Sequence, residues 1–136
     1  MKTIQAFYVG QMAELMTVFT EEKVVQFADI SNDHNPIHLD REYASKSRFG
    51  KRIVHGFLVG SLISAVIANV MPGEGSIYVN QNLNFKRPVF WNDEIRAKVV
   101  ITNIDVEKSL IELSTVCINQ CGKNVIEGTA VIYYPY

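Results

Sequence analysis

Hydrophobic residues are arranged differently in the two halves of the chain. From residue 56 to residue 71 almost every position is apolar, with Ser61, Ser64 and Asn69 as polar exceptions, and Pro72-Gly73 follows. A run of this kind that stops at a proline and a glycine predicts a helix that is buried on every side. It is shorter than the roughly 20 residues needed to span a bilayer, so we expect no membrane span.

After Gly75 the apolar residues alternate with polar ones, which is the period of β-strands. The alternating apolar positions, which predict one buried face, are Ile77, Val79, Leu83 and Phe85, then Ile95, Ala97, Val99 and Ile101. Turn-forming residues at 91–93, 107–108 and 121–124 separate the strands and favour an antiparallel meander. In the last strand, Gly128 and Ala130 are small, which predicts that a helix packs closely there.

The first part of the chain predicts a strand over about 12–19 and two short helices. Thr20 is a candidate N-cap for a helix that runs to about Ile30, and Asp40 is a candidate cap for a second helix through about Lys46. The predicted apolar side of the first helix consists of Val24, Val25, Phe27, Ala28 and Ile30. One apolar helix with a long antiparallel sheet indicates an α+β fold, with the sheet wrapped around the helix, in a single domain over residues 1–136.

Composition excludes several classes of protein and favours none. With 13 basic and 14 acidic residues the net charge is −1, so no basic surface field favours a nucleic-acid partner or an anionic membrane. The two cysteines, Cys117 and Cys121, are too few for a disulfide framework, and we expect reduced thiols. No signal peptide, glycine-rich phosphate loop or zinc-ligand spacing is evident, so we expect a cytoplasmic protein with no bound cofactor and no metal.

The segment Asp-His-Asn-Pro-Ile-His at residues 33–38 holds the candidate chemistry. Asp33 and His38 are two titratable groups on either side of Pro36, which fixes its own φ and disfavours a helix at Asn35, so we expect a stiff irregular loop. Such a pair is suited to general acid–base catalysis. On their own, the two residues are more simply interpreted as a turn or capping carboxylate and a partly buried histidine bonded to the backbone.

The segment also resembles the hydratase motif of the MaoC-like (R)-specific enoyl-CoA hydratases. The resemblance extends over nearly the whole chain, with Asn32 standing where the family usually has glycine. The matching residues are Phe27, Ile30, Ser31, Asp33, Asn35, Pro36, Ile37, His38 and Ala44, then Ile53-Val54-His55-Gly56, Ser61, Ser64, Pro72-Gly73, Gly75-Ser76-Ile77-Tyr78 and Phe85-Lys86-Arg87-Pro88-Val89.

This resemblance implies a hot-dog fold, a homodimer with sites near its interface, and interconversion of trans-2-enoyl-CoA and (R)-3-hydroxyacyl-CoA. It further implies that Asp33 and His38 hold the attacking water and that the backbone N–H of Gly56 binds the thioester oxygen. Asn35 is expected to brace the loop, and Ser64 to lie near the acyl pocket. His55, which precedes Gly56, is expected either to shape the site or to be structural only.

Two other functions are considered beside hydration of an acyl-CoA thioester. Dehydration of 3-hydroxyacyl chains on acyl carrier protein is disfavoured because such dehydratases usually place an acid on the central helix, and residues 56–71 contain no Asp or Glu. A non-catalytic acyl-CoA-binding module has no need of the Asp33 and His38 pair. Six basic residues are candidates either for the phosphates of coenzyme A or for a solvated face: Arg41, Arg48, Lys51, Arg52, Lys86 and Arg87.

Overall fold

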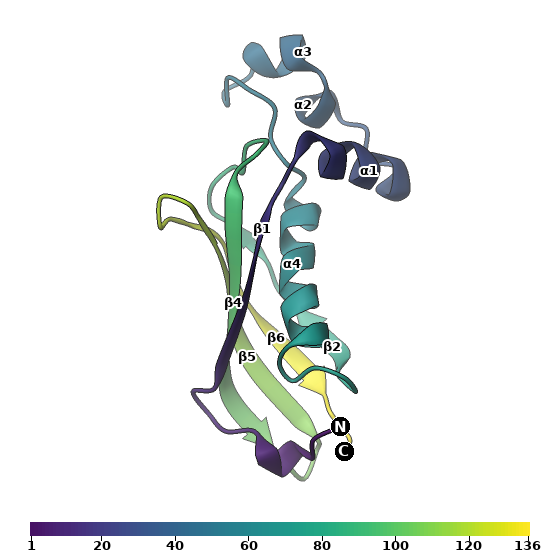
Figure 1. Cartoon of the computed structure of the whole chain (residues 1–136), viewed down its shortest axis with the longest axis vertical. Coiled ribbons are helices and arrows are strands. Elements are labelled where there is room, and N and C mark those ends of the chain that lie inside the picture. The colour runs from purple at the N-terminus through teal and green to yellow at the C-terminus, as the bar shows by residue number, and fades with distance from the viewer.

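The computed structural model describes all residues 1–136 and contains a six-stranded antiparallel sheet with a long helix lying along it (Figure 1). The strands are β1 (Met12–Val18), β2 (Ile77–Gln81), β3 (Asn84–Phe85), β4 (Glu94–Asp105), β5 (Leu110–Asn119) and β6 (Asn124–Tyr133). The order across the sheet is β1-β4-β5-β6-β2, with β3 pairing separately with β6. Strands β4 to β6 thus form the predicted meander, and β1 and β2 are the edges.

The helices divide into one long central helix and three short ones at one end of the sheet. They are α1 (Glu21–Ser31), α2 (Pro36–Leu39), α3 (Arg41–Ser45) and α4 (Gly56–Asn69), and α1 to α3 lie at the upper end in Figure 1. The predicted caps are confirmed, because Lys23 N–H donates to Thr20 Oγ1 at 3.3 Å and Tyr43 N–H donates to Asp40 Oδ1 at 3.0 Å.

Helix α4 packs across β1, β4 and β5, and this contact forms the core. Its Val59, Ile63, Val66 and Ile67 are 0–1% exposed, and the alternating residues of β4 from Ile95 to Ile101 are equally buried. Each large aliphatic side chain buried in this way contributes about 1.5–3 kcal/mol relative to exposure. The predicted buried face of β4 is therefore confirmed.

The prediction that α4 is buried on every side is wrong. Phe57 is 72% exposed, and Ser61 and Ser64 are also exposed, so one face of the helix has no sheet against it. The predicted apolar side of α1 is wrong in part, because Val25 and Ile30 are exposed while Val24 and Ala28 are buried. Both errors arise because a hydrophobic pattern does not distinguish contact with the chain's own core from a surface left for another molecule.

The predicted strand from Ile77 to Phe85 is two strands, and its apolar face is not buried. The register of β2 against β6 shifts between Tyr78 and Asn80, and the chain leaves the ladder before β3. Ile77, Val79 and Phe85 are 50%, 58% and 53% exposed. Because β2 is an edge strand, nothing in the chain covers its outer side.

The small residues of β6 accommodate backbone rather than the central helix. A Cβ at Gly128 would collide with the carbonyl oxygen of Asn82. Asn82 also bonds Thr129 through both its side-chain amide groups, with Nδ2 donating to Oγ1 and Oδ1 accepting from the Thr129 N–H. The expectation of a close helix contact at Gly128 is therefore wrong, because the interruption between β2 and β3 occupies that space.

Two further predictions concern the thiols and the membrane. Both cysteines are free, with Cys117 buried and Cys121 exposed, and burial raises the pKa of the Cys117 thiol to about 12. None of the helices combines the length and apolar character that crossing a bilayer would require.

Candidate active site

The segment that carries Asp33 and His38 is built by two local features. Helix α1 ends at Asn32, which adopts the left-handed conformation with φ 62°. Asparagine tolerates this region better than most residues, so it replaces the glycine that the resemblance led us to expect. Pro36 then starts α2 rather than an irregular loop, because the first position of a helix needs no N–H donor, and Asn35 caps it by accepting from Ile37 N–H at 3.1 Å.

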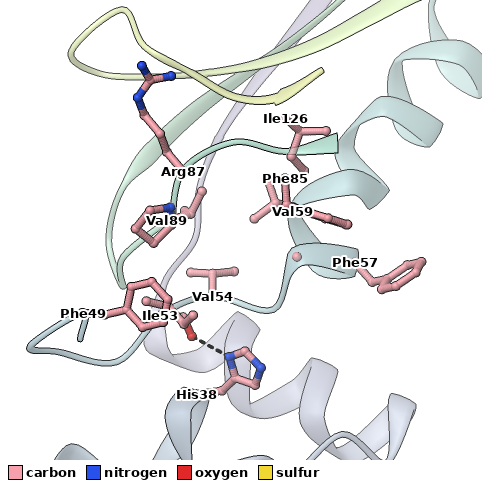
Figure 2. Close-up of a pocket in the computed structure, with 12 residues that line it drawn as sticks. His38, Phe49, Ile53, Val54, Phe57, Val59, Phe85, Arg87, Val89 and Ile126 are labelled. Carbon is pink, nitrogen blue, oxygen red and sulfur yellow. Dashed lines mark hydrogen bonds between the residues drawn. The ribbon is translucent and has the colours of Figure 1, made fainter. Parts of the chain in front are cut away.

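His38 lies in α2 and is 9% exposed. Its Nδ1 is 2.9 Å from the carbonyl oxygen of Ile53 (Figure 2). A carbonyl can only accept, so Nδ1 carries the proton and Nε2 of the neutral ring has a free lone pair. Burial lowers the pKa of His38, an effect that the hydrogen bond to Ile53 and the charge of Asp33 partly oppose. The ring is therefore neutral near pH 7 and able to accept a proton at Nε2.

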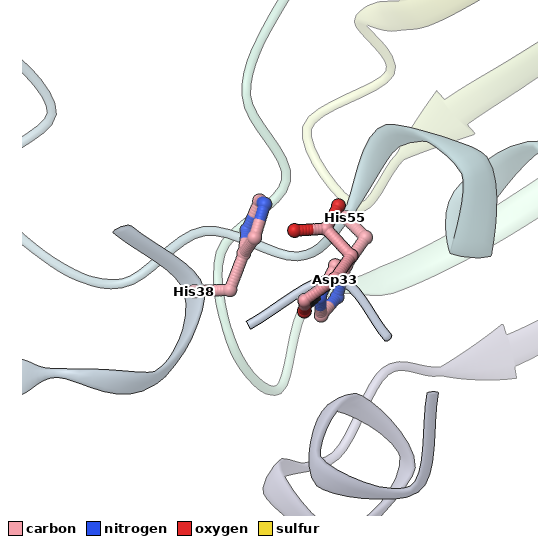
Figure 3. A group of neighbouring side chains, drawn as sticks. All are labelled: Asp33, His38 and His55. Atoms are coloured by element: carbon pink, nitrogen blue, oxygen red, sulfur yellow. Dashed lines mark hydrogen bonds between the residues drawn. The ribbon is translucent and has the colours of Figure 1, made fainter. Parts of the chain in front are cut away.

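Asp33 lies on the exposed turn between α1 and α2. Its Oδ1 accepts a hydrogen bond from Asn35 N–H at 3.3 Å, which fixes the carboxylate relative to the start of α2. Its carboxylate and one ring nitrogen each of His38 and His55 all lie within 4.8 Å of one another (Figure 3). A single water molecule between Asp33 and His38 would be within reach of both.

His55 connects the two catalytic candidates. It is 1% exposed, and its Nε2–H donates to the backbone carbonyl of Asp33 at 3.0 Å. Its ring stacks on His38 with centroids 3.9 Å apart and meets the edge of Phe27 at 4.9 Å. Its Nδ1 is buried and has no hydrogen-bond partner in the chain, so the other contacts hold the ring.

The three residues are nevertheless poorly arranged to share a metal ion. The rings of His38 and His55 are inclined by only 27°, so the lone pairs, which lie in the ring planes, run in nearly parallel planes. Two imidazoles that bind one ion must direct their lone pairs at a common point. The cluster is better suited to holding a proton-transfer pair in place.

Gly56 is the first residue of α4, so no carbonyl within the helix accepts its N–H. The partial positive charge of the helix N-terminus adds to this donor. A Cβ at Gly56 would lie 2.6 Å from Cε1 of Phe85, so a larger residue would press on that ring. The backbone here is open to a ligand oxygen because the residue is glycine.

His38 and Gly56 border the same cavity of about 350 Å³, which we call the apolar pocket (Figure 2). Its lining is mainly hydrophobic, and it consists of His38, Phe49, Ile53, Val54, Gly56, Phe57, Val59, Phe85, Arg87, Pro88, Val89 and Ile126. Asp33 is not part of the wall and approaches from the side of His55. The pocket thus combines apolar walls with a proton acceptor and an oxygen-binding N–H, which suits an acyl thioester.

Of the basic candidates from the sequence, Arg87 lines this pocket, whereas the candidate Ser64 lies outside it. Ser64 lines a different cavity, between α4 and β2, together with Phe57, Gly60 and Tyr78. Sequence reasoning did not identify Phe49 or Phe85 as wall residues. Phe49 was recognisable only as a single aromatic residue in a basic loop, and Phe85 was assigned to a buried sheet face.

Comparison with known proteins identifies the family. The model of the MaoC-like domain matches residues 9–119. The chain belongs to the MaoC-like domain family. It is 41% identical to the (R)-specific enoyl-CoA hydratase of Aeromonas caviae, over 96% of this chain and 98% of that protein, and 37% identical to a mitochondrial 3-hydroxyacyl-[acyl-carrier-protein] dehydratase of Solanum lycopersicum, over 93% and 77%.

Solved structures of two R-hydratases have the same architecture. The R-hydratase of A. caviae involved in PHA biosynthesis superposes with a TM-score of 0.93, covering 96% of this chain and 99% of that one. The R-hydratase PhaJ1 of Pseudomonas aeruginosa, at 41% identity, gives a TM-score of 0.92 and covers 98% and 85%. The expected α+β hot-dog fold is confirmed.

Proposed function

We propose that this MaoC-like protein, as a single domain over residues 1–136, catalyses the (R)-specific hydration of trans-2-enoyl-CoA to (R)-3-hydroxyacyl-CoA and the reverse dehydration. The observation that carries the proposal is the shared apolar pocket, with the neutral imidazole of His38 and the N–H of Gly56 on its wall and the Asp33 carboxylate beside them. The similarity to the A. caviae hydratase over nearly the full length of both chains supports the same reaction.

Hydration adds one water across the double bond, and Asp33 and His38 act on that water. Its oxygen forms a bond to the β-carbon while one of its protons passes to the pair, and the pair delivers a proton to the α-carbon. The lone pair at His38 Nε2 and the Asp33 carboxylate are both able to accept that first proton. Proton transfer by positioned side chains accelerates such reactions by about 10²- to 10⁴-fold.

Negative charge builds up on the thioester oxygen as the β-carbon is attacked. The N–H of Gly56 at the start of α4 stabilises this charge, and a preorganised donor of this kind contributes about 2.7–4 kcal/mol to the transition state. His55 is the positioning residue, because it bonds the backbone of Asp33, stacks on His38 and immediately precedes Gly56. Asn35 fixes the turn, and Ser64 is kept as a supporting residue on the neighbouring cavity.

Dehydration of an acyl chain on acyl carrier protein is the second candidate function. Similarity to the S. lycopersicum dehydratase favours it, since both reactions use the same bond changes in opposite directions. Helix α4 has no Asp or Glu, and this disfavours the dehydratases that place an acid on the central helix. A binding module without catalysis is the third alternative, and activity distinguishes it from both enzymes.

The test is the loss of enoyl-thioester absorbance when purified protein is mixed with crotonyl-CoA and with longer enoyl-CoA thioesters. Chiral analysis of the 3-hydroxyacyl product should give the R isomer alone. Absence of turnover at every chain length would leave the binding module as the better proposal. Faster turnover of crotonyl-acyl carrier protein than of crotonyl-CoA would favour the dehydratase.

Substitutions in the pair test the mechanism. Asp33→Asn and His38→Ala should each lower kcat by about 10²- to 10⁴-fold, because each removes one proton-transfer group. His34→Ala is the matched control, since His34 is an exposed histidine between the two and should keep wild-type activity. Near-native kcat in either pair variant, with an unchanged circular dichroism spectrum, would refute the assignment.

We propose that the active molecule is a homodimer in which strand β2 of one protomer contacts β2 of its partner. We also propose that the protein is cytoplasmic. The exposed apolar residues on and beside this edge strand support the dimer, and they are Phe57, Ile77, Tyr78, Val79 and Phe85. The free thiols Cys117 and Cys121 fit a reducing compartment.

A further inference from the structure

Just over half of the basic residues of this nearly neutral chain lie in two segments that contribute Phe49 and Arg87 to the wall of the apolar pocket. Seven of the 13 lie in two short segments, 41–52 and 86–87, where Glu42 is the one acidic residue. Only Lys46 among these seven forms an ion pair, with Glu42 at 3.2 Å, because the other ion pair of the structure joins Arg96 to Glu14. The remaining cations keep their charge uncompensated.

Three of these cations surround another cavity of about 280 Å³, which we call the basic pocket. It is lined by Arg41, Ser45, Gly50, Lys51, Arg52 and Trp91. Serine and backbone groups add hydrogen-bond donors, and no acidic side chain lies on the wall. A concave site with several unpaired cations favours an anion.

Aromatic contacts hold two of the cations in place without neutralising them. The guanidinium carbon of Arg52 lies 3.6 Å from the centroid of the Trp91 ring, and Nζ of Lys51 lies 4.4 Å from that of Phe90. Ring contacts of this type orient a cation. Nη1 of Arg52 donates to the Leu39 carbonyl at 3.5 Å, and its other N–H groups have no acceptor in the chain. Trp91 therefore contributes to the pocket wall through its ring, which holds Arg52.

The basic and apolar pockets lie along the same pair of chain segments. Residues 50–54 run beside 88–91, joined by the Ile53–Phe90 bridge and by the Val54 N–H donating to Val89 O at 2.7 Å. Phe49, Ile53 and Val89 face the apolar pocket (Figure 2), whereas Gly50, Lys51, Arg52 and Trp91 face the basic one. A ligand that extends along these two segments would occupy both.

We propose that the basic pocket binds the phosphates of the coenzyme A part of the substrate, with Arg41 and Arg52 as the principal ligands. This inference rests on the proposed hydration of enoyl-CoA. Coenzyme A carries a diphosphate and a ribose phosphate at the end of the arm opposite the thioester, and guanidinium groups bind phosphate through paired N–H donors. A small concave site suits a nucleotide phosphate, whereas the surface of an acyl carrier protein would need a broader basic face.

The test compares two substrates that differ in the phosphates. Crotonyl-CoA has them, and crotonyl-pantetheine has the same reacting group and arm without them. Arg41→Gln and Arg52→Gln should each raise the KM for crotonyl-CoA about ten- to hundredfold, because each removes a hydrogen bond to a charged group. The KM for crotonyl-pantetheine should stay unchanged, because this substrate has no phosphates. Lys108→Gln, which removes a basic residue in the turn between β4 and β5, is the matched control and should change neither KM.

Each other outcome overturns the inference. An unchanged KM for crotonyl-CoA in both arginine variants would exclude the basic pocket as the phosphate site. An equal loss with both thioesters would show that the arginines act on folding or on the reaction itself, and a loss confined to crotonyl-acyl carrier protein would assign them to a carrier protein. Arg41→Gln keeps the test valid if Arg52→Gln fails to fold, because Arg41 takes no part in the ring contacts.

A direct binding measurement separates this inference from the proposed function. Isothermal titration of adenosine 3′,5′-bisphosphate should show binding to the wild-type protein that weakens at least tenfold in Arg41→Gln and weakens with added salt. Failure of the hydration assay with intact nucleotide binding would refute the proposed reaction and retain the site. Hydration of crotonyl-CoA without nucleotide binding would refute the site alone.

Discussion

The chemistry of the site begins with the protonation state of His38. Its Nδ1–H is committed to Ile53 O, so any proton gained must go to Nε2, inside a region that burial makes unfavourable for charge. The same side chain therefore affects both the reaction and the stability of the fold. Neither effect was available from the sequence, since a histidine two positions after a proline has no fixed burial.

The lowered pKa of His38 predicts a loss of stability in mild acid. In the unfolded chain the imidazole has its ordinary pKa of 6.5, whereas in the folded protein its pKa is lower. Between these two pKa values the imidazole is protonated mainly in the unfolded state, which stabilises that state. The free energy of unfolding should fall as the pH drops from 7.5 to 5.5, and the fall should stop below the folded-state pKa. Urea unfolding at several pH values should give a smaller drop in His38→Gln. A drop of the same size in this variant would show that other groups cause it.

Residues with local structural roles were predictable from the sequence. The caps Thr20 and Asp40 depend on a few neighbouring positions, so the sequence identified them. Pro36 shows the limit, because its ring is compatible both with an irregular loop and with the first turn of α2. The choice depends on Asn35, whose side chain accepts from Ile37 N–H and makes the helical start favourable.

At the level of elements, the strand edge near β2 is the place where sequence prediction failed most. Gln81 donates from Nε2 to Thr115 Oγ1 at 2.9 Å, and Asn82 bonds Thr129, so side chains replace the regular ladder between β2 and β3. The alternating pattern over 77–85 does not encode this interruption. The interruption depends on cross-strand partners more than 30 positions away in the sequence, which a local pattern cannot reveal. Strand β4 was predictable because its alternation of apolar and polar residues is continuous.

Gly128 provides a test of this interruption. Gly128→Ala would drive a methyl group into the carbonyl oxygen of Asn82, so we expect a loss of about 1–3 kcal/mol in the free energy of unfolding, the usual cost of overpacking. Gly60→Ala in α4 is the matched control. Its new methyl group meets only the flexible end of Leu83 at 3.1 Å, and alanine is favoured over glycine in a helix by about 1 kcal/mol, so we expect no loss of stability. Chemical denaturation measures both. Equal stability of Gly128→Ala and wild type would mean that the Asn82 backbone moves freely.

At the scale of the whole molecule, apolar surface that the sequence assigned to the core is left uncovered along one side. It comes from two elements, with Phe57 on the free face of α4 and Ile77 and Val79 on β2. Isolated exposed hydrophobic residues are ordinary, but a contiguous group beside an unpaired strand edge favours association. The sequence placed these residues wrongly inside one chain, and in the proposed dimer they would lie between two chains. Pairing of β2 with its copy would join two sheets and cover both edges.

A charge on this edge should separate the proposed dimer while leaving the monomer folded. The side chain of Val79 is 58% exposed in the single chain, so Val79→Glu should change the free energy of unfolding of the monomer little. In the dimer, the same substitution would bury two carboxylates of like charge close together at the interface, which is unfavourable. Size-exclusion chromatography with light scattering should give a dimer for wild type and a monomer for the variant. Val106→Glu is the matched control, because Val106 is 48% exposed in the turn between β4 and β5, away from this edge. A dimeric Val79→Glu variant would exclude β2 as the contact, and a monomeric wild-type protein would exclude the dimer itself.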